Sequence, residues 1–330
     1  MTPNLPRLSV VIPLYSEEDN VDRLVDELHQ ALESYQGEFE LVLVDDGSLD
    51  STRKKLLDAR QARGQHIVVL SHRRNLGQTA AMQTGLHAAR GDVVAFMDGD
   101  LQNDPADIPR MVEELVTGQL DLLCGWRKHR QDSLDRTLPS RIANWLIGRV
   151  TGVALHDYGC SLKVGRRDVL DGLDLRGEMH RFIPLWVANL THPSRIQETP
   201  VHHRARTAGV SKYGISRTPR VILDLLAAWF FLRFRERPGH FFGVAGLITG
   251  GLGTLSLGYL VVLKLFGVEI GQRPLLIAGV LLALVGLQLI TTGLVAEMLT
   301  RLKPRPQPPL TRQTDSVQWA QGSHDDSTSA

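Results

Sequence analysis

Short apolar runs alternate with amphipathic segments along the first 240 residues of the chain. Continuous apolar runs of this kind are typical of buried parallel strands. The runs are Leu8–Pro13, Phe39–Val44, Ile67–Leu70, Val93–Met97 and Asp121–Cys124. The segments between them have helical spacing and cover Glu18–Tyr35, Ser51–Arg63, Thr79–Ala89 and Ala106–Thr117. Strands that alternate with helices predict a parallel, doubly wound α/β sheet.

Two later segments, Phe241–Leu263 and Pro274–Ala296, contain no charged residue. Each is about 23 residues long, and a membrane-spanning helix needs roughly 20. Buried core helices are the alternative, but two such runs in succession would require a very large soluble core to cover them. The connection Lys264–Arg273 is short, so the two segments are predicted to form a transmembrane hairpin.

Basic residues flank both apolar segments. They are Arg233, Arg235 and Arg237 before the first, and Arg301, Lys303 and Arg305 after the second. The positive-inside rule places both flanks in the cytoplasm. The segment Met1–Pro6 lacks the apolar core of a signal peptide, so the first domain is expected to stay in the cytosol.

These patterns predict four parts of the chain. They are a soluble α/β domain over 1–215, an interfacial amphipathic helix over 216–240, two spans at about 241–265 and 274–298 within 241–300, and a disordered tail over 301–330. Gly246 and Gly250 form a small-x-x-x-small pair that permits close helix approach, within the hairpin or between subunits. Homo-oligomerisation is therefore possible, and simple tolerance of glycine in membrane helices is the alternative.

Composition excludes several classes of protein. The formal net charge is +1, which argues against a nucleic-acid-binding protein driven by bulk charge. Cys124 and Cys160 are too few and too far apart for a disulfide framework or a cysteine zinc site. The histidines show no H-E-x-x-H pattern.

Acidic residues follow three of the predicted strands. They are Glu17, Asp45, Asp46, Asp98 and Asp100. Ligands of such sheets bind beyond the carboxyl ends of the strands. Carboxylates that converge there without partners would repel one another, so a metal ion and hydrogen-bonding ligand groups are expected among them.

The phosphate-binding motifs of other α/β proteins are missing, because neither G-x-G-x-x-G nor a P-loop occurs. A divalent cation held by the D-x-D of Asp98 and Asp100 is the obvious means of neutralising a diphosphate, with Mg²⁺ or Mn²⁺ as the expected ion. Asp45 and Asp46 could then bind ribose and base. Phosphatases and mutases can also carry D-x-D after a strand, with the first aspartate as nucleophile, but the preceding Asp45–Asp46 pair favours a nucleotide-sugar.

Four motifs together carry a family resemblance. V-V-I-P-L-Y-S-E-E, V-D-D-G-S-L-D-S-T, N-L-G-Q and M-D-G-D-L-Q-N-D-P resemble glycosyltransferase family 2, whose GT-A fold is Rossmann-like with a mostly parallel sheet. Within it, the chain is similar to the dolichol-phosphate mannosyltransferase-like group, and especially to the bacterial undecaprenyl-phosphate transferases for 4-deoxy-4-formamido-L-arabinose and for glucose. The resemblance runs from about Leu8 to Arg301.

The resemblance implies metal-dependent, inverting transfer of a sugar from a nucleotide-sugar, expected to be a UDP-sugar, to a polyprenyl phosphate. The product would serve cell-envelope glycan or lipid modification. It also implies a multi-pass protein of the bacterial inner membrane with the catalytic domain and both termini in the cytoplasm. Asp98, Asp100 and Gln102 are implied to surround the metal and diphosphate. Pro13, Tyr15, Glu17, Asp45 and Asp46 are implied to hold the nucleoside.

Basic residues after the fifth strand are expected to meet the acceptor phosphate. We assign this role to Arg127 and Arg130, although a solvated charge run is the alternative. The family's R-x-x-G-x-S-K motif matches Arg206 to Lys212 and is implied to close over both phosphate groups, with Ser211 at the acceptor phosphate. Arg206 and Lys212 would supply positive charge as the nucleotide leaves.

Asp157 resembles the family's acid in the sugar pocket, where it would orient a sugar hydroxyl or assist attack; a structural role is the alternative. Glu178–Pro184 departs from the arabinose-type pattern, so the sugar is left open. Within that segment, His180 and Arg181 are expected to contact the sugar or the acceptor phosphate, and Arg181 is assigned to the phosphate. The segments Ser140–Val153 and Thr218–Leu232 are predicted to lie at the membrane surface, with a core-facing helix as the alternative for the first.

The acceptor phosphate is already ionised near neutral pH, so transfer requires no strong general base. Two rival functions remain open. A processive polysaccharide synthase would carry Q-x-x-R-W and a longer membrane channel, and neither is found in this sequence. A non-catalytic membrane assembly partner would not need the intact D-G-D-L-Q and R-x-x-G-x-S-K motifs.

Overall fold

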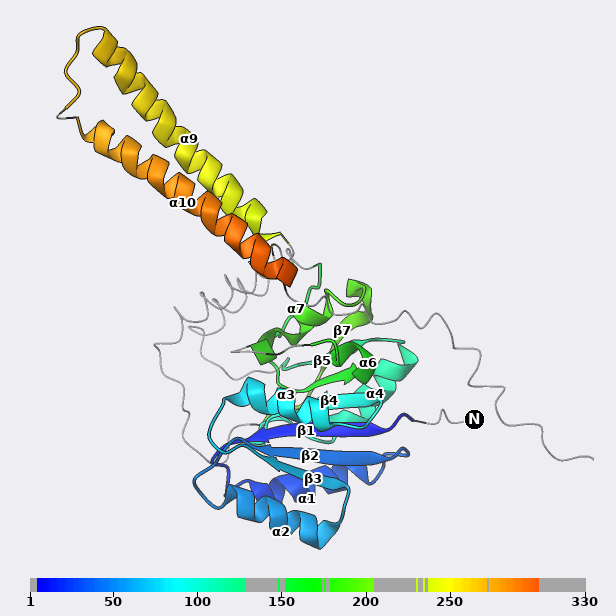
Figure 1. The fold of residues 1–330 in the computed structure, drawn as a ribbon. Coiled ribbons are helices and arrows are strands. Elements are labelled where there is room, and N and C mark those ends of the chain that lie inside the picture. The colour runs from blue at the N-terminus through cyan, green and yellow to red at the C-terminus, as the bar shows by residue number, and fades with distance from the viewer. Residues whose placement is uncertain are drawn as a thin grey trace, which may run out of the picture. The chain divides into compact units, whose positions relative to one another are not determined.

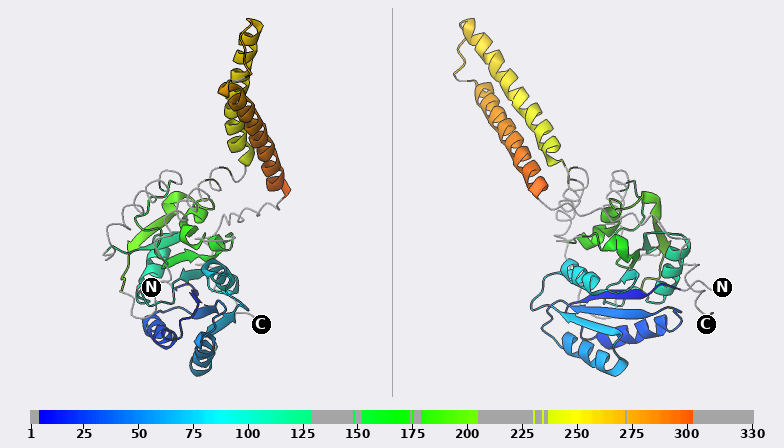
Figure 2. Two further views of the ribbon diagram at one scale, coloured as in Figure 1. Left: turned by 90° about the vertical axis from the view of Figure 1, so that its left-hand side faces the viewer. Right: turned by 45° about the vertical axis from the view of Figure 1, so that its right-hand side comes forward.

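The computed structural model describes residues 5–128, 148, 152–173, 175, 179–204, 230, 234, 237–271 and 273–302. These residues belong to two compact units, one within residues 1–212 and the other within 213–305. The first is an α/β domain and the second is built on a helical hairpin (Figures 1 and 2). The predicted boundary at 215–216 and most of the predicted interfacial helices and tail lie outside the described residues.

The α/β domain contains a seven-stranded sheet with the order β3-β2-β1-β4-β6-β5-β7. Its strands are β1 Leu8–Leu14, β2 Phe39–Asp45, β3 Ile67–Ser71, β4 Val93–Phe96, β5 Leu122–Trp126, β6 Lys163–Arg166 and β7 Ile196–Pro200. The first five confirm the predicted strands to within a few residues. The expected mostly parallel sheet is also confirmed.

The sheet departs from parallel order at one strand, β6. This strand runs antiparallel to both of its neighbours, β4 and β5. A long connection follows β5 in the chain, and β6 then lies between β5 and β4 in the sheet (Figure 1). The parallel pairing of β5 with β7 then extends the sheet beyond the five predicted strands.

The helices of this domain match the predicted segments. They are α1 Val21–Leu32, α2 Thr52–Arg63, α3 Gln78–Ala88 and α4 Asp107–Thr117. Shorter elements follow: α6 Arg167–Leu170, the 3₁₀ turn η1 Met179–Phe182, α7 Ile183–Val187 and the 3₁₀ turn η2 Pro193–Arg195. In α1 the predicted apolar stripe is buried, with Val21, Leu24 and Leu28 inaccessible to solvent. This burial fixes the helix on the sheet.

Helix α3 lies unusually close to β1 and β2. A Cβ added to Gly85 would come within 2.3 Å of Val11 Cγ1 and 3.2 Å of Val44 Cγ2. Only glycine allows this approach without moving the helix, because real Cβ atoms do not make contacts that short. The amino end of α3, at Gln78 and Thr79, is thereby held over the carboxyl ends of the central strands.

The second unit contains α9 Pro238–Leu265 and α10 Pro274–Leu302, which pack against each other (Figure 1). Both are long and apolar enough to cross a membrane. Only 17% and 11% of their most apolar windows are buried inside the protein, so the alternative of soluble core helices does not fit. Both are therefore candidate membrane spans. Because α10 continues to Leu302, the predicted tail begins within this helix.

Glycines form the contact between α9 and α10. A Cβ on Gly246 would lie 2.7 Å from the carbonyl oxygen of Gly286, and one on Gly286 would lie 2.4 Å from Gly250 Cα. The predicted small-x-x-x-small pair is thus used within the hairpin. A Cβ on Gly251, in contrast, would meet no atom of the described part of the chain within 4 Å. Homo-oligomerisation through these helices stays a prediction.

Candidate active site

The turn after β4 carries the D-x-D residues Asp98 and Asp100. Leu101 adopts a left-handed conformation with φ 62°, yet its side chain is buried at 3% exposure. The backbone N–H of Gln102 donates to Asp100 Oδ1 at 3.2 Å. A leucine in this conformation costs about 1–2 kcal/mol, and such strain is common where a site needs a fixed backbone. The buried Leu101 side chain therefore anchors a turn that presents Asp98, Asp100 and Gln102 together.

Asp98 lies in an environment that disfavours its negative charge. Burial and the neighbouring Asp100 raise the pKa of Asp98 to about 6, although a hydrogen bond with Ser161 and the charge of Lys163 act in the opposite direction. The side-chain amide of Gln78 donates to Asp98 Oδ1 at 2.6 Å. A cation at this turn would offset the repulsion between the two carboxylates.

The donor set fits Mg²⁺ or Mn²⁺, since both prefer carboxylate and amide oxygens. Among the described residues, no group of three or more His, Cys, Asp or Glu side chains forms a ready-made metal site. Magnesium is commonly held by only one or two carboxylates, with substrate phosphates completing its shell. The turn is therefore suited to a metal that arrives together with a diphosphate.

The turns after β1 and β2 are joined by hydrogen bonds. Ser16, with φ 53°, donates its N–H to Ser48 Oγ at 2.9 Å, and the N–H of Glu17 donates to Thr52 Oγ1 at 2.9 Å. Pro13 pairs with Val44, one residue before Asp45. Adjacent parallel strands thus bring the predicted nucleoside residues, including Tyr15, to one edge of the sheet.

Several of the strand-end acids accept hydrogen bonds from the chain itself. Asp46 is 2% exposed and accepts bonds from the N–H groups of Leu76 and Gly77, at 2.9 and 2.8 Å. His72 Nδ1 lies 2.7 Å from the same carboxylate. Asp46 therefore holds the loop that precedes α3. In addition, Glu17 accepts a bond from Asn20 Nδ2 at 2.6 Å.

Arg127 and Asp157, predicted to act separately, form a pair. The Nε and Nη2 atoms of Arg127 donate to the two oxygens of Asp157 at 2.7 and 2.9 Å. The N–H of Gly159 also donates to Asp157 Oδ1 at 3.1 Å. Both side chains are mostly buried, at 13% and 10% exposure. Asp157 is thus in a position to orient the guanidinium predicted to meet the acceptor phosphate.

Breaking this pair should destabilise the protein. We expect Arg127→Gln or Asp157→Asn to lower the free energy of unfolding by roughly 3 kcal/mol, because each leaves a buried charge without its partner. The double variant should lose less than the sum of the single losses. Thermal unfolding of the full-length protein in detergent measures these differences. The exposed pair Arg166–Asp168 is the control, where single substitutions should cost under about 1 kcal/mol. Strictly additive losses at Arg127 and Asp157 would contradict the expected coupling.

Three residues near Asp98 were not predicted as site residues. Lys163 on β6 is 1% exposed, and its ammonium group donates to the carbonyl oxygen of Cys160. Ser161 receives a bond from Asn103 Nδ2 at 2.7 Å in addition to its bond with Asp98. Gln78 stands in the N-L-G-Q motif, which could have identified it. Lys163 gave no comparable signal because β6 itself was not predicted.

The chain that leads to the R-x-x-G-x-S-K motif is anchored beside the D-x-D turn. The N–H of Arg204 donates to the carbonyl oxygen of Gln102 at 2.8 Å, and Asn103 forms a β-bridge with His203. The Arg204 guanidinium bonds both Glu27, at 2.6 Å, and Asp104, at 2.5 Å. Arg130, Arg206, Ser211 and Lys212 themselves lie outside the described residues.

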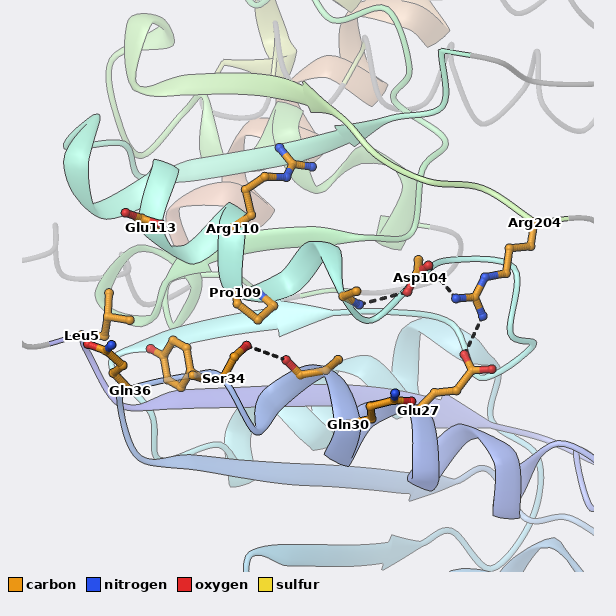
Figure 3. A pocket seen from close by; sticks show the side chains of 13 residues that line it. Leu5, Glu27, Gln30, Ser34, Gln36, Asp104, Pro109, Arg110, Glu113 and Arg204 are labelled. Atoms are coloured by element: carbon orange, nitrogen blue, oxygen red, sulfur yellow. Dashed lines mark hydrogen bonds and ion pairs between the residues drawn. The ribbon is translucent and has the colours of Figure 1, made fainter.

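A groove of about 720 Å³ runs along α1 and α4 (Figure 3). Its lining includes Arg204, which pairs with both Glu27 and Asp104, as the dashed lines in Figure 3 show. None of Glu17, Asp45, Asp46, Asp98 and Asp100 lines it. The groove is therefore separate from the acidic strand ends.

Comparison with known proteins adds a family match. The sequence profile described as glycosyl transferase family 2 matches residues 9–173. The dodecaprenyl-phosphate galacturonate synthase of Rhizobium johnstonii is 55% identical over 299 residues, covering 89% of this chain and 88% of that protein. The undecaprenyl-phosphate 4-deoxy-4-formamido-L-arabinose transferase of Pseudomonas fluorescens is 36% identical, covering 89% of this chain and 85% of that protein.

Solved structures share the fold of the α/β domain. The glucosyl-3-phosphoglycerate synthase of Mycobacterium tuberculosis, in complex with Mn²⁺, uridine diphosphate and glucosyl-3-phosphoglycerate, aligns with a TM-score of 0.55 at 20% identity. The alignment covers 68% of this chain and 80% of that one. The mannosyl-3-phosphoglycerate synthase of Rubrobacter xylanophilus aligns with a TM-score of 0.54 at 16% identity, covering 68% of this chain and 74% of that one.

Proposed function

Because this chain belongs to glycosyltransferase family 2, we propose that it transfers a sugar from a nucleotide-sugar to a polyprenyl phosphate. The main support for the proposal is that one chain contains both the Asp98–Asp100 turn and a hairpin of two candidate membrane spans. A soluble acceptor would not require the hairpin. The relatives named for dodecaprenyl-phosphate and undecaprenyl-phosphate products match about nine-tenths of the chain, and thus support a lipid-linked acceptor.

The donor is proposed to bind at the acidic strand ends. Pro13, Tyr15, Glu17, Asp45 and Asp46 would hold the nucleoside, with uridine as the expected base. Asp98, Asp100 and Gln102 would hold Mg²⁺ or Mn²⁺, which when bound neutralises the diphosphate. Related structures with Mn²⁺ and a uridine nucleotide are consistent with this donor site.

The acceptor is proposed to approach from the side of Arg127. An ionised phosphate oxygen attacks the anomeric carbon, the bond to the nucleoside diphosphate breaks, and the configuration inverts. Asp157 holds Arg127 in the bidentate pair, so it contributes by orientation and is not required as a strong base. Arg130, Arg206, Ser211 and Lys212 remain candidates for the phosphate groups on sequence grounds.

The proposed location is the bacterial inner membrane, with the α/β domain and both termini in the cytoplasm. A polyprenyl phosphate acceptor is itself a membrane lipid, so an anchor that keeps the domain near the bilayer raises the local concentration of acceptor. The basic residues on both flanks of the hairpin support this orientation.

The decisive experiment is product formation from a panel of donors. Purified full-length protein, undecaprenyl phosphate and Mn²⁺ or Mg²⁺ are incubated with labelled UDP-galacturonate, UDP-4-deoxy-4-formamido-arabinose, UDP-glucose and GDP-mannose. We expect one donor to yield an organic-extractable, mild-acid-labile lipid carrying a single sugar, and EDTA to abolish it. A lipid with several sugars would favour a processive synthase. Absence of product together with absence of nucleotide binding would favour the non-catalytic partner.

A further inference from the structure

The 3₁₀ turn η1 lies beside the residues that hold the D-x-D turn. Thr79 Oγ1 is 2.7 Å from His180 Nδ1, which links the amino end of α3 to η1. The residue before Thr79 is Gln78, whose amide bonds Asp98 at 2.6 Å. Two adjacent residues of α3 therefore connect the proposed metal-binding aspartate to η1, although about 80 residues separate Asp98 and η1 along the chain.

His180 contacts both the next side chain, Arg181, and the amino end of α3. Burial, with the charges of Arg181 and Lys163, lowers the pKa of His180 to about 3, so the imidazole is neutral. Arg181 Nε lies 3.4 Å from His180 Nε2. A guanidinium can only donate, so Nε2 is the acceptor and the Nδ1–H donates to Thr79 Oγ1. The buried imidazole thus ties a half-buried cation to the amino end of α3.

A cation at this place can interact with the transferred sugar. If the diphosphate is held at Asp98 and Asp100, the sugar ring lies one bridging oxygen further on, and the contacts of Gln78, Thr79 and His180 connect this turn to Arg181. A guanidinium matches a carboxylate in shape and charge, and their paired hydrogen bonds are stronger than those to a neutral hydroxyl. Arg181 is therefore suited to a sugar that carries a carboxylate.

We propose that Arg181 binds the carboxylate of a uronic acid donor, with His180 as its positioning residue, and that this chain transfers a hexuronate. The inference rests on the proposed function and assigns Arg181 to the sugar in place of the acceptor phosphate. One comparison agrees with it, since the 55% identical relative is named for galacturonate.

The test compares two donors that differ only in this group. UDP-galacturonate and UDP-galactose have the same ring stereochemistry, with a carboxylate in one replaced by a hydroxymethyl group in the other. Full-length protein, undecaprenyl phosphate and Mn²⁺ are used to measure kcat/KM for each donor. We expect the wild-type protein to prefer UDP-galacturonate, and Arg181→Gln to reduce that preference roughly 10- to 150-fold, the range expected for hydrogen bonds to a charged group. Arg181→Lys should retain an intermediate preference.

Arg166→Gln is the matched control, since Arg166 is an exposed arginine at the end of β6, and it should retain the wild-type preference. Turnover of UDP-galactose by Arg181→Gln shows that this variant is folded. Competition by unlabelled UDP-galacturonate and UDP-galactose against the wild-type protein gives the same preference without any substitution.

Three outcomes would overturn the inference. An unchanged donor preference in Arg181→Gln would exclude the sugar contact. An equal loss with both donors, together with a raised KM for undecaprenyl phosphate, would return Arg181 to the acceptor phosphate. Product only from donors without a carboxylate would refute the hexuronate but leave the proposed function intact. Absence of product from every nucleotide-sugar, in contrast, would refute the proposed function itself.

Discussion

Replacing Asp100 with alanine should lower kcat/KM for sugar transfer by at least about 1,000-fold, because charge stabilisation at the diphosphate is worth several kcal/mol. The fold should survive. Asp100 is half-buried, and its removal also relieves the repulsion that helps to raise the pKa of Asp98. We therefore expect the melting temperature to stay within about 5 °C of the wild-type value. Both quantities are measured on the detergent-solubilised full-length protein.

Asp92→Ala is the matched control for this variant. Asp92 is an exposed aspartate immediately before β4, at the opposite end of the strand that leads to Asp98. It should retain wild-type turnover and wild-type Mn²⁺ dependence. Undiminished turnover by Asp100→Ala would contradict the assignment of Asp100 to the metal.

Replacing Gly286 with leucine should separate α9 from α10. A Cβ at this position would lie 2.4 Å from both the Cα and the N of Gly250, and backbone atoms cannot rotate away as a side chain can. We expect a loss of at least about 3 kcal/mol in helix packing, the upper end of the range for overpacking. Cross-linking of a Leu257→Cys, Gly279→Cys pair measures the separation, because a Cβ on Gly279 lies 3.1 Å from Leu257 Cγ. The cross-link should form readily in the parent and poorly with Gly286→Leu.

Gly251→Leu is the control, since a Cβ at this position of α9 meets no atom of the described protein within 4 Å. The cross-link should form in this variant as it does in the parent. Equal cross-linking in the two leucine variants would show that the glycine contact does not hold the hairpin together.

The sequence best predicts those elements whose hydrophobic pattern fits only one kind of secondary structure. The apolar run that begins at Leu8 is buried throughout β1, and the apolar stripe from Val21 to Leu32 is buried on α1. Both patterns depend only on which face of the element is buried, so they can be recognised from the local sequence. Strand β6 escaped prediction because it is four residues long and contains a buried lysine, Lys163, which reads as a surface residue. The charge of Lys163 interacts favourably with Asp98, a neighbour that the sequence alone could not identify.

The candidate site was predicted in its residue types but not in its pairings. Because the D-x-D residues and the other acids follow strands of a mostly parallel sheet, the sequence placed them correctly at one edge of that sheet. Spacing could not show that Arg127 pairs with Asp157, since 30 residues separate them. Nor could it show that Asp46 bonds the N–H groups of Leu76 and Gly77, because these contacts depend on how a loop folds back over the strand ends.

The missing side chain of Gly85 couples packing in the core of the α/β domain to two hydrogen bonds at the amino end of α3. Helix α3 rests directly on Val11, and its first two residues bond Asp98 on one side and His180 on the other. A Cβ at Gly85, in the carboxyl-terminal half of α3, would push the helix away from Val11 and displace both bonds. Such a change touches neither Asp98 nor His180, yet it would alter the spacing between them. The packing beneath one helix thus determines the geometry at the edge of the sheet where Asp98 lies.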